Sequence, residues 1–387
     1  MVLQKKIAPL RSRGIDLFRP EILLLILWTV VNTFFLIRRG IFMEGESIKY
    51  IQEARLFLNT GRLSTPNFWL YFVQIALLAL CIRLKIGFAL AVIVQLLFNL
   101  TATFYFYKTI IHILKDKRIA LAGTLLLLLN FPYQEFNTFL QTESLFYSFT
   151  LIASCYLFHI DKPSLKQLLT MILLLIVICF TRPTGVLFLP PAFLYLFLIF
   201  FRKMSLAKKT ALLAAIGIGF FFILDKAMGS GGELDFMLPF RDERIICGVP
   251  TLPGFLPIKT TGNGNSIYGL LYYIVHNPVQ FIRMAGLRSL AFFGLYRSYF
   301  GLGHNLYLIV FFWSLHAMVL SALIYWVKEQ PVIFCYGLSI ILLTWLTVIL
   351  TCDDWHNRFY LSISPFVILL GLPFFSKILK KNSDAHT

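Results

Sequence analysis

Long apolar runs separated by short polar links are the main pattern of this chain. Ten of these runs are long enough, and sufficiently free of charge, to cross a bilayer as helices, so they predict an all-α, polytopic membrane protein. A β-barrel would need alternating apolar and polar residues, which the unbroken Leu, Ile and Phe runs lack. The predicted spans are residues 21–38, 86–107, 119–134, 141–160, 167–181, 184–201, 208–226, 305–327, 331–350 and 359–377.

A further apolar stretch, residues 68–82, disturbs the pattern of charges. If it crossed the membrane, the basic patch from Lys108 to Arg118 would face outward, against the enrichment of Lys and Arg in cytoplasmic loops. We therefore expect an interfacial or re-entrant helix here, lying on the outer face of the membrane. A true span with a local violation of the charge rule is the alternative.

Composition supports the same class and excludes a soluble globule. Hydrophobic residues make up 58% of the 387-residue chain, charged residues only 14%, and 40 residues are phenylalanine. The 35 basic and 18 acidic residues give a net charge of +17, which in a soluble protein would suggest a nucleic-acid partner. Because cytoplasmic loops of membrane proteins collect Lys and Arg, we expect membrane lipids as partners and no nucleic acid.

The basic residues gather in five patches that indicate the orientation. Placing every patch in the cytoplasm gives ten crossings with both termini inside. The N-terminus is basic and its apolar run begins late, so we expect a retained first span and no cleaved signal peptide. Residues 1–377 then form a single transmembrane domain, followed by a short basic tail at residues 378–387. The patches are residues 5–13, 108–118, 161–166 and 202–209, and the tail with Lys377, Lys380 and Lys381.

The outer face receives acidic residues and arginines together. The long outer loop, residues 228–304, is too short and too rich in Gly and Pro to hold a second domain. Its stretch 278–297 has apolar residues at helical spacing with Arg283 and Arg288 interleaved, which predicts an interfacial helix that either anchors the loop or contacts a lipid phosphate. The other outer segments are residues 39–66 with Glu44 and Glu46, the turn with Glu135 and Glu143, Thr181-Arg182-Pro183, and the link from Cys352 to Arg358.

Several chemistries have no motif in the chain. There is no Gly-rich phosphate loop followed by Lys-Ser/Thr, no GxGxxG, no GxSxG and no HExxH, so no nucleotide cofactor is expected. His304 and His356 lie on the outer side but have no second ligand at metal spacing, so a divalent metal is not supported. Of the six cysteines, Cys247 and Cys352 fall on the outer side, where a disulfide could join them.

The first outer loop contains a helix signal with chemistry of its own. The run Glu44-Gly45-Glu46-Ser47-Ile48-Lys49-Tyr50 opens a helical stretch that closes at Asn59-Thr60-Gly61. Acids in the first turn suit the positive end of a helix, and this role alone would explain either glutamate. A carboxylate at such a place could instead accept a proton as a general base.

The order of motifs resembles that of the polytopic, lipid-linked glycosyltransferases of the GT-C superfamily. Members often have Asp-Ser-x-x-Tyr followed by Ala and Gly in the first outer loop, much as Glu46-Ser47, Tyr50, Ala54 and Gly61 stand here. The resemblance covers about residues 20–377 and is strongest for members similar to protein O-mannosyltransferases and lipid A aminoarabinose transferases. Three further matches follow in order, namely Thr142-Glu143-Ser144-Leu145-Phe146, Thr181-Arg182-Pro183-Thr184-Gly185, and Arg358-Phe359-Tyr360 with Pro365.

The resemblance implies inverting transfer of a sugar from a polyprenyl-phosphate donor to a hydroxyl of a lipid, glycan or protein. The site would face the periplasm from the inner membrane of a bacterium. Glu46 would be the base, with Glu44 as its substitute because the family more often has Asp at this place, and Glu143 would be the second carboxylate. Arg182 and Arg358 would hold the donor phosphate. The other expected substrate contacts are Tyr50, Arg283, Arg288 and His356.

Other interpretations of the same residues stay open. Arg182 and Arg358 could only reach toward lipid headgroups from the ends of their helices. A ligase or polymerase of polyprenyl-linked glycans would also use arginines on the outer face, although the acidic first loop favours the GT-C resemblance. A transporter or lipid flippase would usually show internal repeats and broken helices at mid-membrane, and none is evident here.

Overall fold

The computed structural model describes residues 19–161, 164–201, 204–228, 237–249, 258–261 and 266–376. Over these residues the chain is helical, and extended pairing is limited to two isolated bridges, Phe42 with Phe139 and Ile246 with Asp353. The basic patch at residues 5–13 and the basic tail at residues 378–387 lie outside the described residues. The all-α architecture predicted from the apolar runs is confirmed for the described part of the chain.

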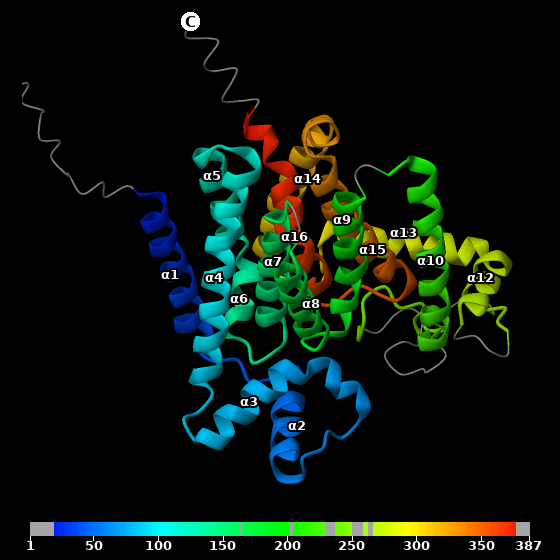
Figure 1. The fold of residues 1–387 in the computed structure, drawn as a ribbon. Helices are drawn as coiled ribbons and strands as arrows, with labels where there is room; N and C mark the ends of the chain where they lie inside the picture. Colours follow the sequence, from blue (N-terminus) through cyan, green and yellow to red (C-terminus); the bar gives the residue numbers. More distant parts are fainter. Residues whose placement is uncertain are drawn as a thin grey trace, which may run out of the picture.

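Figure 1 shows the arrangement of the helices, most of which run upright beside one another. The longer α-helices are α1 (Pro20–Arg39), α2 (Glu46–Thr60), α3 (Phe72–Leu84), α4 (Ala89–Leu114), α5 (Lys117–Leu129), α7 (Glu143–Phe158), α8 (Leu165–Cys179), α9 (Leu189–Phe200), α10 (Leu206–Met228), α12 (Ile267–His276), α13 (Pro278–Gly294), α14 (Leu302–Glu329), α15 (Pro331–Leu350) and α16 (Arg358–Gly371). The short ones are η1 (Pro66–Tyr71), α6 (Phe131–Glu135), η2 (Phe136–Thr138), η3 (Pro183–Phe188) and α11 (Leu238–Arg241).

The length and apolar composition of the described helices are those of an integral membrane protein. Seven helices could cross a membrane by these two criteria, and the bent pair α5 and α6 raises the number to eight. The α7 and α8 helices are apolar but shorter, with 16 and 15 residues, and α10 has 23 residues. Polar side chains cap the starts of α5 and α8. Asp116 accepts hydrogen bonds from backbone N–H groups in the first turn of α5, and Ser164 forms a capping box with Gln167 at the start of α8.

The predicted straight span at residues 119–134 is instead broken between α5 and α6, which meet at an angle of 63°. Asn130 leaves the helical conformation, and Pro132 supplies no backbone N–H in the first turn of α6. Side chains satisfy the backbone at the break, since Gln134 donates to the carbonyl of Leu127 at 3.0 Å and Tyr307 donates to that of Leu129. The chain therefore changes direction at Asn130 before α7 begins.

The segment between α1 and α4 packs below the bundle in the view of Figure 1, where α2 and α3 lie together. The predicted helical stretch is α2, which ends at Gly61 in the left-handed conformation, as the Asn-Thr-Gly signal indicated. Residues 68–82 fall in η1 and α3, and α3 runs obliquely beneath the lower end of α4. The combined segment Pro66–Leu84 is also one of the seven helices that pass the test of length and composition.

The centre of the bundle is formed by α7 and α16. Almost every residue of α7 is buried, and 78% of the apolar window of α16 is buried inside the protein. Both helices begin at the end of the bundle that faces α2. The α13 helix runs across the direction of the upright helices and packs on α15 (Figure 1).

Candidate functional site

Four charged residues from distant parts of the sequence meet where helices begin. Glu46 is the first residue of α2, Glu143 of α7 and Arg358 of α16, and Arg182 directly precedes η3. Arg358 lies at the centre, because its Nη1 is 2.7 Å from Glu46 Oε2 and 2.7 Å from Glu143 Oε1. Its Nη2 donates to Asp354 Oδ2 at 2.7 Å. We call these five residues the ion-pair cluster.

Arg182 closes the cluster on the side of η3. Its Nη1 is in direct contact with Glu143 Oε1, so Glu143 bridges the two arginines. The turn that holds Arg182 packs very tightly on the end of α8, since a Cβ atom at Gly185 would lie 2.5 Å from the carbonyl oxygen of Ile178. Any larger residue at Gly185 would therefore displace Arg182.

Burial is uneven across the cluster, and this separates the roles of its carboxylates. The side chain of Glu143 is fully buried, whereas that of Glu46 is 34% exposed. Glu46 is thus the carboxylate that an outside molecule can reach. Two acids at helix starts are favoured by the positive ends of α2 and α7, while Arg358 at the start of α16 is not and depends on its three carboxylate partners.

The charges of the cluster hold one another in the ionised form. Burial disfavours the carboxylate of Glu46, but the Arg358 guanidinium more than offsets this effect and the pKa of Glu46 lies at about 2. The same balance of burial against Arg358 puts the pKa of Asp354 at about 2. Because both values lie below the ordinary ones, these pairs stabilise the fold above about pH 4 and lose their effect as the pH falls toward 2.

Asp354 is the member of the cluster that sequence reasoning missed. It accepts from the backbone N–H of His356 at 2.9 Å and from the guanidinium of Arg358, four residues later. The signal in the sequence was an acid placed one helical turn before an arginine at the start of the last span. The adjacent pair Asp353-Asp354 obscured it, because only the structure shows which of the two points into the cluster.

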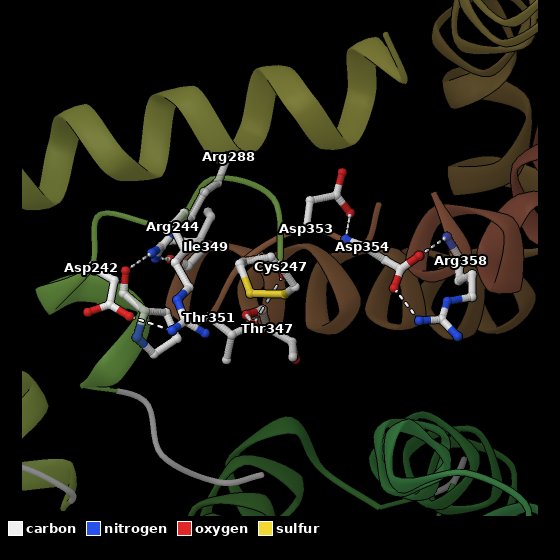
Figure 2. The surroundings of a disulfide bond; sticks show 12 residues. Asp242, Arg244, Cys247, Arg288, Thr347, Ile349, Thr351, Asp353, Asp354 and Arg358 are labelled. Carbon is white, nitrogen blue, oxygen red and sulfur yellow. Dashed lines mark hydrogen bonds and ion pairs between the residues drawn. A yellow bond between two sulfur atoms is a disulfide. The ribbon is translucent and has the colours of Figure 1, made fainter. Parts of the chain in front are cut away.

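A disulfide and two backbone hydrogen bonds hold the link around Asp354. Cys247 is bonded to Cys352, with Cα atoms 5.4 Å apart, so the disulfide that the sequence allowed is present in the structure. The N–H of Cys247 donates to the carbonyl of Asp353 at 2.7 Å, and the N–H of Asp353 donates to that of Ile245 at 2.8 Å. Figure 2 shows the disulfide, with Asp353, Asp354 and Arg358 on one side of it.

Two buried arginines of the segment between α10 and α14 complete the support. Arg297 pairs with Asp353 at 2.5 Å, and burial nevertheless raises the pKa of Asp353 to about 6. Arg288 is fully buried and donates to the carbonyls of Pro239, Arg244 and Ile349. Figure 2 shows Arg288, Arg244 and Ile349 near the disulfide. Burial lowers the pKa of Arg288 to about 10. This position argues against the predicted contact of Arg288 with a substrate or lipid phosphate, since its guanidinium holds backbone.

A buried polar network positions Glu143 from the other side. Asn137 donates to Asn32 at 2.8 Å and accepts from Ser144, the neighbour of Glu143, at 2.7 Å. Gln95 donates to the carbonyls of Asn137 and Phe139. These bonds connect the start of α7 to α1 and α4 through uncharged side chains, which help to fix the position of Glu143.

The remaining predicted residues divide into near and distant ones. The hydroxyl of the buried Tyr50 lies 3.5 Å from Glu46 Oε2, and His356 is bound to Asp354 through its backbone. Glu44 is exposed, and the ion pairs of the described residues do not include it. Arg283 is 49% exposed and lies 3.7 Å from Glu243, outside the cluster. The structure thus brings Glu46, Glu143, Arg182, Arg358 and Tyr50 together and leaves Glu44 and Arg283 apart.

No group of three or more His, Cys, Asp or Glu in the described part of the chain could hold a metal ion. The three carboxylates of the cluster pair with arginines. Comparison of the chain with family models, with curated proteins and with solved structures finds no match.

Proposed function

We propose that this protein is an inverting glycosyltransferase that moves a sugar from a polyprenyl-phosphate donor to a hydroxyl acceptor. The observation that carries this proposal is the ion-pair cluster, in which a reachable carboxylate, Glu46, lies beside two arginines at one end of the bundle. The order of motifs that resembles the GT-C superfamily supplies the class of reaction. The cluster supports it because motifs spread over more than 300 residues converge there.

In the proposed reaction, the acceptor oxygen attacks the anomeric carbon of the sugar from the side opposite the phosphate. The new C–O bond forms as the bond from the anomeric carbon to the phosphate oxygen breaks, and the phosphate leaves with that electron pair. Glu46 accepts the proton of the acceptor hydroxyl. Arg182 and Arg358 bind the oxygens of the departing phosphate, where a guanidinium fork in a partly dehydrated site is most effective.

The low pKa of Glu46 would make its carboxylate a weak base in the free protein. Binding of the proposed donor would raise this pKa. The ion pair with Arg358 keeps the carboxylate acidic, at about 2. A donor phosphate that accepts from Arg358 neutralises part of its charge, so the pKa of Glu46 rises toward its ordinary value. Donor binding would thus activate the base, and Glu143 and Asp354 would keep Arg358 in place throughout.

We also propose ten crossings, with both termini in the cytoplasm and the cluster on the outer face. The count includes α7, α8, α10 and the bent pair α5 and α6, and places α3 and α13 in the interface. The disulfide between Cys247 and Cys352 supports an oxidising, outer location for the cluster, because it lies two residues from Asp354. The periplasmic face of a bacterial inner membrane would satisfy this requirement.

A cysteine introduced at Lys115 tests the topology. We expect it to resist an impermeant maleimide in intact cells, because Lys115 follows α4 at the end of the bundle remote from the cluster. The matched position is Arg62, exposed after α2, where a cysteine is expected to react. Both variants are made with the four free cysteines replaced by alanine. Labelling at position 115 but not at position 62 would invert the proposed orientation.

Purified protein in lipid nanodiscs tests the proposed activity directly. We expect transfer of radiolabelled sugar from a polyprenyl-phosphate hexose or pentose to material from a bacterial envelope extract, with inversion at the anomeric carbon. The same preparation without acceptor should release little label. Movement of intact donor lipid between leaflets of a liposome, with the sugar still attached, would identify a flippase and contradict the proposal.

A further inference from the structure

A groove of about 510 Å³ opens on the surface of the bundle between α1, α6 and α14. Its walls are mostly apolar and include Val31, Phe34, Phe131 and Tyr307. Its volume lies within the range of ~300–1,000 Å³ that ligand sites in proteins occupy. Only 22% of the apolar window of α1 is buried, so the helix that forms one wall of the groove is largely exposed, as a lipid-facing helix would be. It is shaped to receive an apolar chain that comes from the bilayer.

The groove also has a charged end with an excess of positive charge. Arg38 and Arg39, in the last turn of α1, line this end together with Glu135 and His304. Arg39 pairs with Glu135, whereas the exposed Arg38 pairs with no acidic side chain of the described residues. One cation therefore remains for an anionic headgroup, at the level where the lipid phosphates of the bilayer lie.

A short chain of contacts connects the charged end of the groove to the ion-pair cluster. The ring centroids of His304 and Phe300 are 4.6 Å apart, and those of Phe300 and His356 are 6.0 Å apart. His356 binds Asp354, a member of the cluster, through its backbone N–H at 2.9 Å. Burial lowers the pKa of His356 to about 4, and the positive charges of Arg358 and Arg39 lower it as well.

The loop that follows α1 leads from the groove to the exposed base. Six residues, 40–45, separate Arg39 from Glu46. Phe42 binds the backbone of Thr138 and Leu140, just before Glu143, so this loop is fixed against the cluster. A headgroup that extends past Arg39 along the loop approaches Glu46, which is the reachable carboxylate.

We infer that this groove binds the acceptor, and that the acceptor is an anionic phospholipid with a free hydroxyl in its headgroup. The inference rests on the proposed glycosyl transfer. Each part of such a lipid has a partner: the chain fits the apolar groove, the phosphate pairs with Arg38, and the hydroxyl gives its proton to Glu46. Its oxygen bonds to the anomeric carbon as the donor phosphate leaves with the electrons of the broken bond.

Photo-crosslinking tests the site without reference to activity. The probe is phosphatidylglycerol with a diazirine on one acyl chain, in nanodiscs of phosphatidylcholine, and labelled peptides are identified by mass spectrometry. We expect saturable labelling of α1 and α6 that unlabelled phosphatidylglycerol displaces. Arg38→Gln should weaken the apparent affinity by about tenfold. Labelling that rises in proportion to the probe without saturation would identify ordinary annular lipid and overturn the inference.

A pair of tryptophan variants on α1 separates a groove from a general lipid-facing surface. Val31→Trp fills the groove, whereas Ile26→Trp enlarges an exposed residue of the same helix that does not line it. We expect the first to abolish saturable labelling and the second to retain it. Equal labelling in both variants would overturn the site. Stronger displacement of the probe by polyprenyl phosphate would assign the groove to the donor and overturn the acceptor role.

Kinetics separate failure of this inference from failure of the proposed function. With phosphatidylglycerol as acceptor, Val31→Trp should raise the KM for the phospholipid and leave the KM for the donor unchanged. If Val31→Trp transferred sugar with an unchanged KM for the phospholipid, the acceptor role of the groove would be overturned and the glycosyltransferase activity would be retained. Saturable binding in a wild-type protein that transfers no sugar would retain the lipid site and reject the glycosyltransferase.

Discussion

Replacing Glu46 with glutamine is expected to lower the rate of sugar transfer by about 10²-fold or more, because the amide cannot accept the proton of the acceptor hydroxyl. The fold should survive the change. Glu46 is 34% exposed, and Arg358 keeps Glu143 and Asp354 as partners. The measurement is kcat in nanodiscs at saturating donor and acceptor, with donor binding determined separately by displacement of a fluorescent polyprenyl phosphate.

Glu44→Gln is the matched control, since Glu44 lies two residues away in the same loop and is exposed. We expect it to change kcat by less than about threefold, as substitutions on a surface usually do. If Glu44→Gln abolished transfer and Glu46→Gln did not, the base would be Glu44. Full activity in both variants would leave the acids of this loop as helix caps and remove the best evidence for an enzyme.

The convergence of the cluster could be predicted from the sequence for a physical reason. Charged groups at membrane depth are expensive, so those that remain at the ends of apolar runs tend to gather where they can pair. Counting spans by the charge rule put Glu46, Glu143, Arg182 and Arg358 on one face, and ion pairs of the structure join all four. Each of these residues taken singly could be a helix cap or a headgroup contact, and only their shared face indicated that they form one site.

Other features depend on contacts that a linear pattern does not contain. The break between α5 and α6 is stabilised by Tyr307, which is far away in sequence, so residues 119–134 looked like one span. Arg288 looked like a headgroup contact because it alternates with apolar residues, but it holds three carbonyls. Nothing in its spacing distinguishes a buried arginine from an interfacial one, because both lie among apolar neighbours.

Substitutions at Glu143 are expected to affect stability as well as activity. Glu143 is fully buried between two arginines, so its loss would leave both cations without a shared partner. Removing one member of a buried ion pair typically costs about 3–5 kcal/mol, most of it from the charge left behind. Effects at Glu143 would therefore combine stability with catalysis. Substitutions that keep the charge of an arginine give a cleaner test of phosphate binding.

Arg358→Lys is expected to reduce turnover of the polyprenyl-phosphate donor by about 10²-fold, comparable to the loss of one donor in a site that stabilises developing charge. Lysine keeps the positive charge among Glu46, Glu143 and Asp354 but cannot donate in a planar fork to several oxygens at once. The control is Arg283→Lys, because Arg283 is half exposed and outside the cluster. Thermal unfolding in detergent, followed by intrinsic fluorescence, reports whether the Lys variant is folded.

The ratio of effects on kcat and KM then decides what Arg358 does. If it stabilises the leaving phosphate, kcat falls and the donor KM changes little, since the interaction strengthens only as the bond breaks. If it holds the donor equally throughout, KM rises and kcat is kept. Arg182→Lys should show the same pattern more weakly, because Arg182 contacts a single carboxylate of the cluster, Glu143. Wild-type kinetics in both Lys variants would reduce the arginines to structural partners of Glu143 and reject the phosphate-binding role.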